Sequence, residues 1–231
     1  MTSSAALVPE ELHPALWRAS QLARSYARCI DTGHEALSMQ LSGGGWPTGS
    51  MTDLLVQQPG IGELRLLAPA LATVAKRQII FLQPPHAPQV LALAGMRIPP
   101  ESALWLRGDR TADVLWAAEQ VLRSGSCGAL LLWQHQVRAE NLRRLTLAAQ
   151  AGETLFFMMR PLAAAQDPSP APLRLALRPR AGGIEIDFVK RRGPLRDEPL
   201  FLPMPIVPAH RMQPQRQPVP VYPDMEPAVH H

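Results

Sequence analysis

The chain has 231 residues, 46% hydrophobic and 18% charged, which is enough apolar material for one substantial buried core. Its formal net charge of +4 permits contact with nucleic acid or an acidic partner but does not require it. The two cysteines, Cys29 and Cys127, are isolated, and no apolar run reaches about 18 residues, which argues against disulfide-rich secreted proteins and membrane-spanning proteins. We therefore expect a cytoplasmic protein with reduced thiols, no signal peptide and no membrane contact.

The first predicted element is an amphipathic helix from about Leu12 to Ile30, where apolar residues recur at helical spacing. We treat residues 1–30 as an N-terminal helical unit. A turn-rich stretch over residues 42–49 follows and contains Trp46 among glycines. This tryptophan has two interpretations, packing beneath a sheet or serving as an exposed anchor for a partner.

Short apolar runs then alternate with segments of helical periodicity. Strands are predicted at residues 51–56, 78–82, 103–106, 128–133 and 154–159, and helices at 63–75, 88–94, 112–122 and 138–150. Strands that are apolar throughout and separated by helices predict a mostly parallel sheet covered on both faces. Because Trp105, Trp116 and Trp133 fall inside these elements, we interpret them as structural.

The last third of the chain has a different character. A linker rich in proline and alanine, residues 161–172, leads to two alternating segments, 173–177 and 184–189, which predict a β-hairpin. Beyond Pro203 the sequence is rich in proline, glutamine and arginine, so we predict a disordered tail over 206–231. The folded core is assigned to residues 31–205, an α/β domain with a C-terminal hairpin.

A strand, a turn with glycines and a helix form the setting of a phosphate-binding loop, whose working motif is Gly, four residues, then Gly-Lys-Ser/Thr. Aligned on Gly62, the sequence keeps Gly60 but has Gln57 at the first glycine, Glu63 at the lysine and Leu64 at the magnesium-binding hydroxyl. The charge reversal at Glu63 turns an attraction of roughly 1–4 kcal/mol for phosphate into repulsion. Leu64 offers no oxygen to a metal ion. Glu63 stands where an anion would bind, and the helix dipole favours it by about 0.3–1 kcal/mol.

The other positions of nucleotide chemistry are also altered. The apolar strand before Gln134 ends without the magnesium-organising aspartate. A base that activates water could follow the strand 78–82, but the residues there are Gln83, Pro84, Pro85 and His86, of which only His86 could take a proton. We predict a degenerate ATPase scaffold without catalytic residues, metal or cofactor. The alternative is that Gly60 and Gly62 make a tight turn in a fold that never bound nucleotide.

Four short sequence motifs carry a resemblance to a known family. They are Asp-Thr-Gly-His-Glu-Ala-Leu at 31–37, Gly-Gly-Gly-Trp-Pro-Thr-Gly at 43–49 and Gly-Ile-Gly-Glu-Leu-Arg-Leu-Leu at 60–67, with Lys-Arg-Arg-Gly at 190–193 near the end. Together they resemble the ImuA family, over about residues 12–205. The resemblance implies a RecA-like fold, an accessory role in error-prone translesion synthesis during the bacterial SOS response, and a relationship to the SulA cell-division inhibitors.

The resemblance also implies partners. These are RecA and an ImuB-like homologue of Y-family polymerases, with an error-prone replicative-type polymerase reached indirectly and nucleoid association after DNA damage. The alternative that it implies is a SulA-like inhibitor that binds FtsZ. RecA's two mobile DNA-binding loops have no long glycine-rich, basic counterparts here, because one connection is only 134–137 and the other is the 161–172 linker. DNA binding in the RecA manner is therefore not expected.

Basic side chains crowd the predicted hairpin. Residues 174–196 contain seven arginines and lysines and two acidic residues, a local charge of +5. Such a segment is interpreted either as a surface for phosphate backbones or an acidic partner, or as a solvated edge whose cations discourage strand pairing. The candidate surface residues are Arg178, Arg180, Lys190, Arg191, Arg192 and Arg196.

Overall fold

The computed structural model describes residues 28–87, 89–194 and 198–204. The strands are β1 (Cys29–Asp31), β2 (Gly45–Pro47), β3 (Ser50–Val56), β4 (Ile79–Leu82), β5 (Ala103–Leu106), β6 (Ala129–Trp133), β7 (Leu155–Pro161), β8 (Leu173–Arg180), β9 (Gly183–Lys190) and β10 (Leu200–Pro203). The helices are α2 (Glu35–Ser38), α3 (Glu63–Val74), α4 (Val90–Gly95), α5 (Thr111–Ser124) and α6 (Ala139–Ala149), with 3₁₀ turns η2 (Pro100–Ser102) and η3 (Leu162–Gln166). None of these helices is long and apolar enough to cross a membrane.

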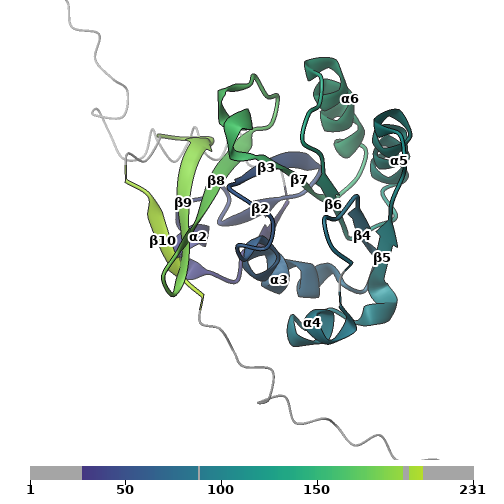
Figure 1. Ribbon diagram of the computed structural model, residues 1–231. Coiled ribbons are helices and arrows are strands. Elements are labelled where there is room, and N and C mark those ends of the chain that lie inside the picture. The colour runs from purple at the N-terminus through teal and green to yellow at the C-terminus, as the bar shows by residue number, and fades with distance from the viewer. Residues whose placement is uncertain (1–27, 88, 195–197, 205–231) are drawn as a thin grey trace, which may run out of the picture.

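Eight strands form one sheet in the order β10-β9-β8-β3-β7-β6-β4-β5, and β1 and β2 form a separate antiparallel pair (Figure 1). The six strands from β8 to β5 run parallel, whereas β9 and β10 are antiparallel additions at one edge. The prediction of an α/β domain with a mostly parallel sheet and a C-terminal hairpin is confirmed. Strand β3 lies inside the sheet between β8 and β7, and the loop that leads to α3 follows its carboxyl end.

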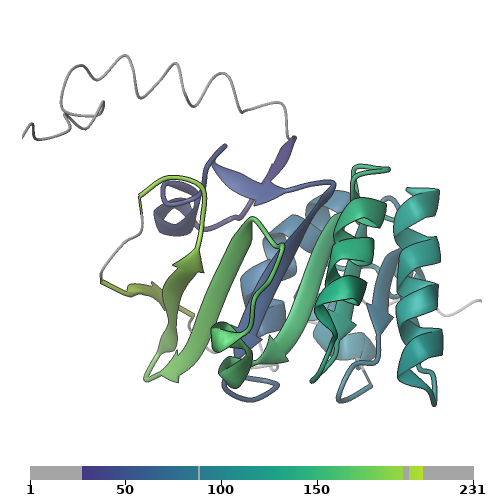
Figure 2. The ribbon, with the colours of Figure 1, turned by 90° about the horizontal axis from the view of Figure 1, so that it is seen from above.

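Helices cover both faces of this sheet, with α2, α3 and α4 on one side and α5, α6 and η3 on the other (Figures 1 and 2). Residues of β3 alternate between the two layers, because successive side chains of a strand point to opposite faces. Leu54 and Val56 join the core under α3, whereas Met51 joins the core under α5 and α6. Burial on both faces explains why the strands are apolar throughout.

Trp46 is fully buried and contributes to the core on the α3 side of the sheet. Its ring meets Phe157 of β7 edge to face, with centroids 5.3 Å apart and planes at 89°. Aromatic pairs favour this geometry because the positive ring edge meets the negative face. The interpretation of Trp46 as a packing residue is confirmed.

The structure departs from the prediction in three places. Cys29–Asp31 is a strand paired with Gly45–Pro47, so a helix reaching Ile30 is wrong at its end; its part before residue 28 lies outside the described residues. The predicted linker contains η3. Leu200–Pro203 extends the hairpin as β10, because Leu200 and Leu202 bury against the core, a pairing that short local patterns do not reveal. The predicted tail, 206–231, also lies outside the described residues.

A buried ion cluster joins three neighbouring strands on the η3 face. Asp53 of β3 accepts a hydrogen bond from Arg174 Nε of β8 at 3.0 Å and lies 3.5 Å from Arg160 Nη1 of β7. All three side chains are buried, and burial raises the pKa of the Asp53 carboxyl while the two guanidinium groups oppose that rise. A buried charge is tolerated when it is paired and hydrogen-bonded, as each of these is.

The same arginines fasten the 161–172 connection to the sheet. Arg174 donates to the carbonyl oxygens of Ala164 at 2.7 Å, Asp167 at 3.1 Å and Ala165 at 3.3 Å, and Arg160 bonds the Asp167 carboxylate at 2.8 Å. The connection is therefore held against β7 and β8 by charge-assisted hydrogen bonds, which are stronger than neutral ones.

Replacing Asp53 with alanine should strongly destabilise the fold, because Arg160 and Arg174 would remain buried without their shared acceptor. Removing one member of a buried ion pair costs about 3–5 kcal/mol. We expect Asp53→Ala to lower the free energy of unfolding by that amount in urea denaturation. The exposed Asp109, substituted in the same way, should change stability by less than about 0.5 kcal/mol. A loss below about 1 kcal/mol for Asp53→Ala would contradict this role.

Candidate functional site

The loop that joins β3 to α3 has the shape of an anion-binding turn. Gly60 and Gly62 adopt φ angles of +87° and +118°, in the region that favours glycine. Gly62 is the N-cap of α3, so the first unpaired N–H groups of that helix face the loop. Backbone donors gathered at a helix N-terminus attract negative charge.

The Glu63 carboxylate occupies these donors. Its Oε1 accepts from the Gly60 N–H at 2.8 Å and its Oε2 from the Gly62 N–H at 3.1 Å, and the side chain is only 3% exposed. The carboxylate lies at the positive end of the α3 dipole, where a negative charge is stabilised. An incoming phosphate would have to displace a buried, hydrogen-bonded anion and would be repelled by it. In this conformation the loop is filled by its own side chain.

The other positions compared with a phosphate-binding loop lie at the start of α3 and after β3, β4 and β6. Leu64 is half-buried and packs against the core on the α3 side, and Gln57 is exposed at the end of β3. Pro85 and His86 are exposed after β4, and Gln134 follows β6 with its N–H bonded to the Met159 carbonyl at 3.1 Å. Across the described part of the chain, no group of three or more His, Cys, Asp or Glu side chains is placed to hold a metal ion.

The basic residues of the hairpin do not form one surface. Arg178 and Arg180 lie near its tip, where they pair with Asp187 and Glu185 of the opposite strand, the second pair at 2.8 Å. Lys190 lies at the other end of the hairpin, opposite Arg174. Six residues of extended strand separate Arg174 from Arg180, so the two ends are about 20 Å apart. Two neighbours, Arg191 and Arg192, follow Lys190, and Arg196 is outside the described residues.

Most of the cations at the far end are also engaged. Lys190 Nζ donates to the Ser169 carbonyl at 3.2 Å. Arg191 donates to the carbonyls of Gln40 at 2.8 Å and Pro194 at 2.6 Å and lies over the Phe188 ring at 4.9 Å. The exposed Arg192, by contrast, lines a pocket. Arg174, which contributes to the +5 charge of the segment, is buried in the Asp53 cluster and is not on the surface.

An apolar edge that the sequence did not predict lies at β5, the last strand of the sheet. Trp105 of β5 is 45% exposed, Trp116 of α5 is 62% exposed and Leu91 of α4 is 78% exposed, with Val90 and Leu104 beside them on the same elements. Figure 1 shows β5 at the rim of the sheet with α4 and α5 on either side. The interpretation of Trp105 and Trp116 as core residues is wrong, whereas Trp133 is buried as expected.

A signal for one of these residues existed. In α5 the buried apolar positions are Val114, Leu115, Ala118 and Leu122, which share one helical face, and Trp116 falls outside that face. For Trp105 no local signal exists, because a four-residue apolar strand looks the same at the centre and at the edge of a sheet. Its exposure follows from strand order alone.

Comparisons with known proteins give a partial likeness. No protein-family model matches the chain. Over 109 residues it is 32% identical to the cell division inhibitor SulA of Edwardsiella piscicida. The matched part is 45% of this chain and spans 65% of the length of that protein. The chain is thus similar to a SulA protein over less than half of its own length.

Removing the Glu63 carboxylate should destabilise the loop and create an anion site. Glu63→Ala loses two hydrogen bonds to a charged acceptor, so we expect the free energy of unfolding to fall by about 1.5–3 kcal/mol. The freed N–H groups should then bind sulfate, which should stabilise the variant more than it stabilises the wild type.

Glu140→Ala is the matched control, since Glu140 also lies in the first turn of a helix but is exposed. It should lose less than about 0.5 kcal/mol and show no additional sulfate effect. Equal sulfate stabilisation of the Glu63→Ala variant and the wild type would show that the loop does not form an anion site.

Proposed function

We propose that this chain is a non-catalytic accessory protein of SOS-induced, error-prone translesion DNA synthesis, in which it binds RecA and an ImuB-like partner. The observation that carries the proposal is the Glu63 carboxylate on the loop donors of Gly60 and Gly62. Because a side chain of the protein itself accepts the hydrogen bonds of these loop N–H groups, no nucleotide is needed to order the loop. Its activity would then depend on surfaces that bind other proteins. The choice of translesion synthesis as the pathway rests on the ImuA-like sequence motifs.

The β5 edge supports protein binding. An outer strand presents unpaired backbone N–H and C=O groups, and natural proteins usually protect such edges with charge, proline or a covering segment. In the part of the chain that the structure describes, no strand pairs with the outer side of β5. Exposed tryptophans are common anchors of protein interfaces because each buries a large area. We assign this edge, with Trp105 at its centre, to a protein partner that adds a strand.

A second candidate function is inhibition of cell division through FtsZ. It is favoured by the similarity to SulA over 109 residues. The same filled loop and the same apolar edge would serve this function equally well, because it also requires binding and no catalysis. The two candidates therefore differ in partner and not in chemistry.

The translesion proposal predicts binding to purified RecA or to the ImuB-like protein, with the β5 edge as the contact. Trp105→Ala should weaken the binding of at least one of these partners tenfold or more in a pull-down or calorimetric titration. Phe201→Ala is the control, since Phe201 is a similarly exposed aromatic residue on β10, at the opposite edge of the sheet. Binding of neither protein by the wild type would overturn the proposal. Equal effects of the two substitutions would remove the β5 assignment alone.

The division-inhibitor candidate predicts a different outcome in cells. Overexpression of the full chain should produce long, undivided filaments, and Trp105→Ala should restore normal cell length at the same protein level. Cells of normal length under wild-type overexpression would exclude this candidate. Filaments with no RecA or ImuB-like binding would favour it over the translesion role.

A further inference from the structure

A pocket of about 250 Å³ lies at the amino-terminal end of β3, the end of the strand opposite the Glu63 loop. It is bounded by the β1–β2 pair, the starts of β3 and β8, the end of α6 and the segment after β9. Its volume is below the roughly 300–1,000 Å³ of sites for drug-sized ligands. A small ligand, or the end group of a larger one, would fit.

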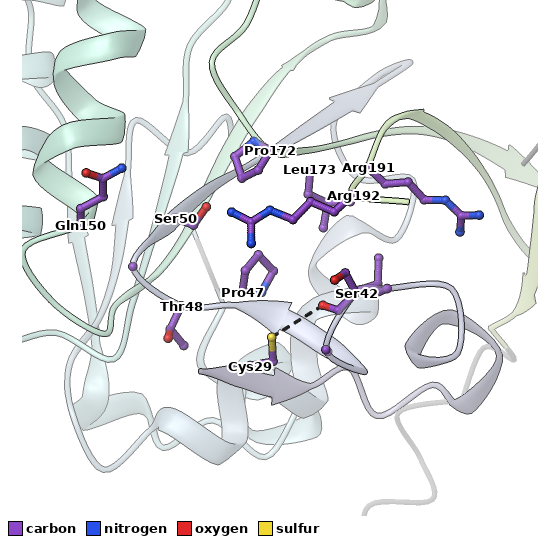
Figure 3. Close-up of a pocket in the computed structure, with 14 residues that line it drawn as sticks. Cys29, Ser42, Pro47, Thr48, Ser50, Gln150, Pro172, Leu173, Arg191 and Arg192 are labelled. Carbon is purple, nitrogen blue, oxygen red and sulfur yellow. Dashed lines mark hydrogen bonds between the residues drawn. The ribbon is translucent and has the colours of Figure 1, made fainter. Parts of the chain in front are cut away.

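Two arginines and no carboxylates line this pocket. Arg191 is anchored by the Gln40 and Pro194 carbonyls, and Figure 3 shows its side chain directed to one side. Arg192 extends across the pocket in the other direction, toward Ser50 (Figure 3). Within the described residues the Arg192 guanidinium has no recorded hydrogen bond or ion pair, so its charge is available to a ligand.

Neutral polar side chains surround the same space. Ser42, Ser50 and Gln150 line the pocket, and none of the three has a side-chain hydrogen bond in the described part of the protein. Together with Arg192 they come from four separate segments that bound the pocket. A phosphate group presents three strong acceptor oxygens in different directions, whereas a carboxylate presents two in one plane.

The surroundings of the pocket do not oppose an anion. Glu153, just beyond α6, pairs with Arg28 at 2.8 Å. The Cys29 thiol at the pocket wall approaches the Ser42 carbonyl oxygen at 3.8 Å. Burial raises the pKa of this thiol, although Arg192 opposes the rise, so it stays uncharged near neutral pH and does not repel a phosphate.

We propose that this pocket binds a terminal phosphate monoester, held by Arg192 with Ser42, Ser50 and Gln150 as further donors. Guanidinium groups match phosphate oxygens in geometry as well as charge. The monoester belongs either to a free nucleoside monophosphate or to the phosphorylated 5′ end of a DNA strand. This inference does not depend on the partners proposed above.

Calorimetric titration of the full chain with inorganic phosphate and with deoxyadenosine monophosphate tests the site. We expect saturable binding that Arg192→Ala weakens at least tenfold. Arg143→Ala is the matched control, because Arg143 is exposed on α6 and has no recorded ion pair among the described residues, and it should leave affinity within twofold. Absence of saturable binding, or equal weakening in both variants, would overturn the proposal.

Cys29 offers an independent test of location. It is half-buried at the pocket wall, whereas Cys127 is 1% exposed, so a thiol reagent should modify Cys29 selectively. Saturating deoxyadenosine monophosphate should slow this modification at least fivefold in the wild type and not in Arg192→Ala. An unchanged rate despite binding would place the ligand elsewhere and overturn the assignment.

A pair of single-stranded oligonucleotides with and without a 5′ phosphate separates the two sources. Competition by the phosphorylated strand alone would identify a DNA end, and competition by neither, alongside nucleotide binding, would identify a free nucleotide. Equal, Arg192-dependent binding of both strands would show recognition of internal phosphodiesters and overturn the monoester proposal.

Discussion

The β3–α3 turn imposes a constraint that the rest of the domain must satisfy. Its glycine backbone gathers N–H groups at the start of α3, and such groups require an acceptor when they are shielded from water. A nucleotide-binding protein leaves this requirement to its ligand. Here Glu63 satisfies it from within the chain, at 2.8 and 3.1 Å from two loop nitrogens. The helix start, and with it the core beneath α3, is therefore complete without a bound phosphate.

The motifs that carry the family resemblance contribute to local turns and to packing of the core. Thr32 accepts from the His34 N–H at 3.0 Å, and His34 Nε2 lies 3.2 Å from the Leu66 carbonyl of α3. A side chain at Gly33 would meet Pro69 at 2.2 Å, so the turn before α2 can pack on α3 only as glycine. Trp46 fills the core beside Phe157. These motifs thus reflect packing within the domain, and they do not indicate which surface would bind a partner.

Local patterns predicted the elements of the parallel sheet closely, because strands buried on both faces are apolar throughout and helices between them carry one apolar face. Of the candidate site, they also indicated that Glu63 would stand where an anion binds. They could not reveal features that depend on distant pairings. Strand β10 forms by pairing with β9, and Arg174 is buried because it bonds to Asp53. Trp105 is exposed because β5 is the last strand of the sheet. The basic segment is divided for the same reason, because Arg178 and Arg180 pair with acidic residues across the hairpin whereas Arg191 bonds to Gln40.

The distance between the β5 edge and the Arg192 pocket decides whether binding at one can affect binding at the other. The β5 edge and the Arg192 pocket lie on different parts of the sheet, with β4, β6 and β7 between β5 and the pocket strand β3. Four strand spacings of about 4.8 Å put them roughly 20 Å apart, so occupancy of one does not block the other. Coupling between them would require an element with two arrangements. The Asp53 cluster works against such an element in the central strands, because it joins β3, β7 and β8 through buried charges. Independent binding at the two sites is therefore what this architecture favours.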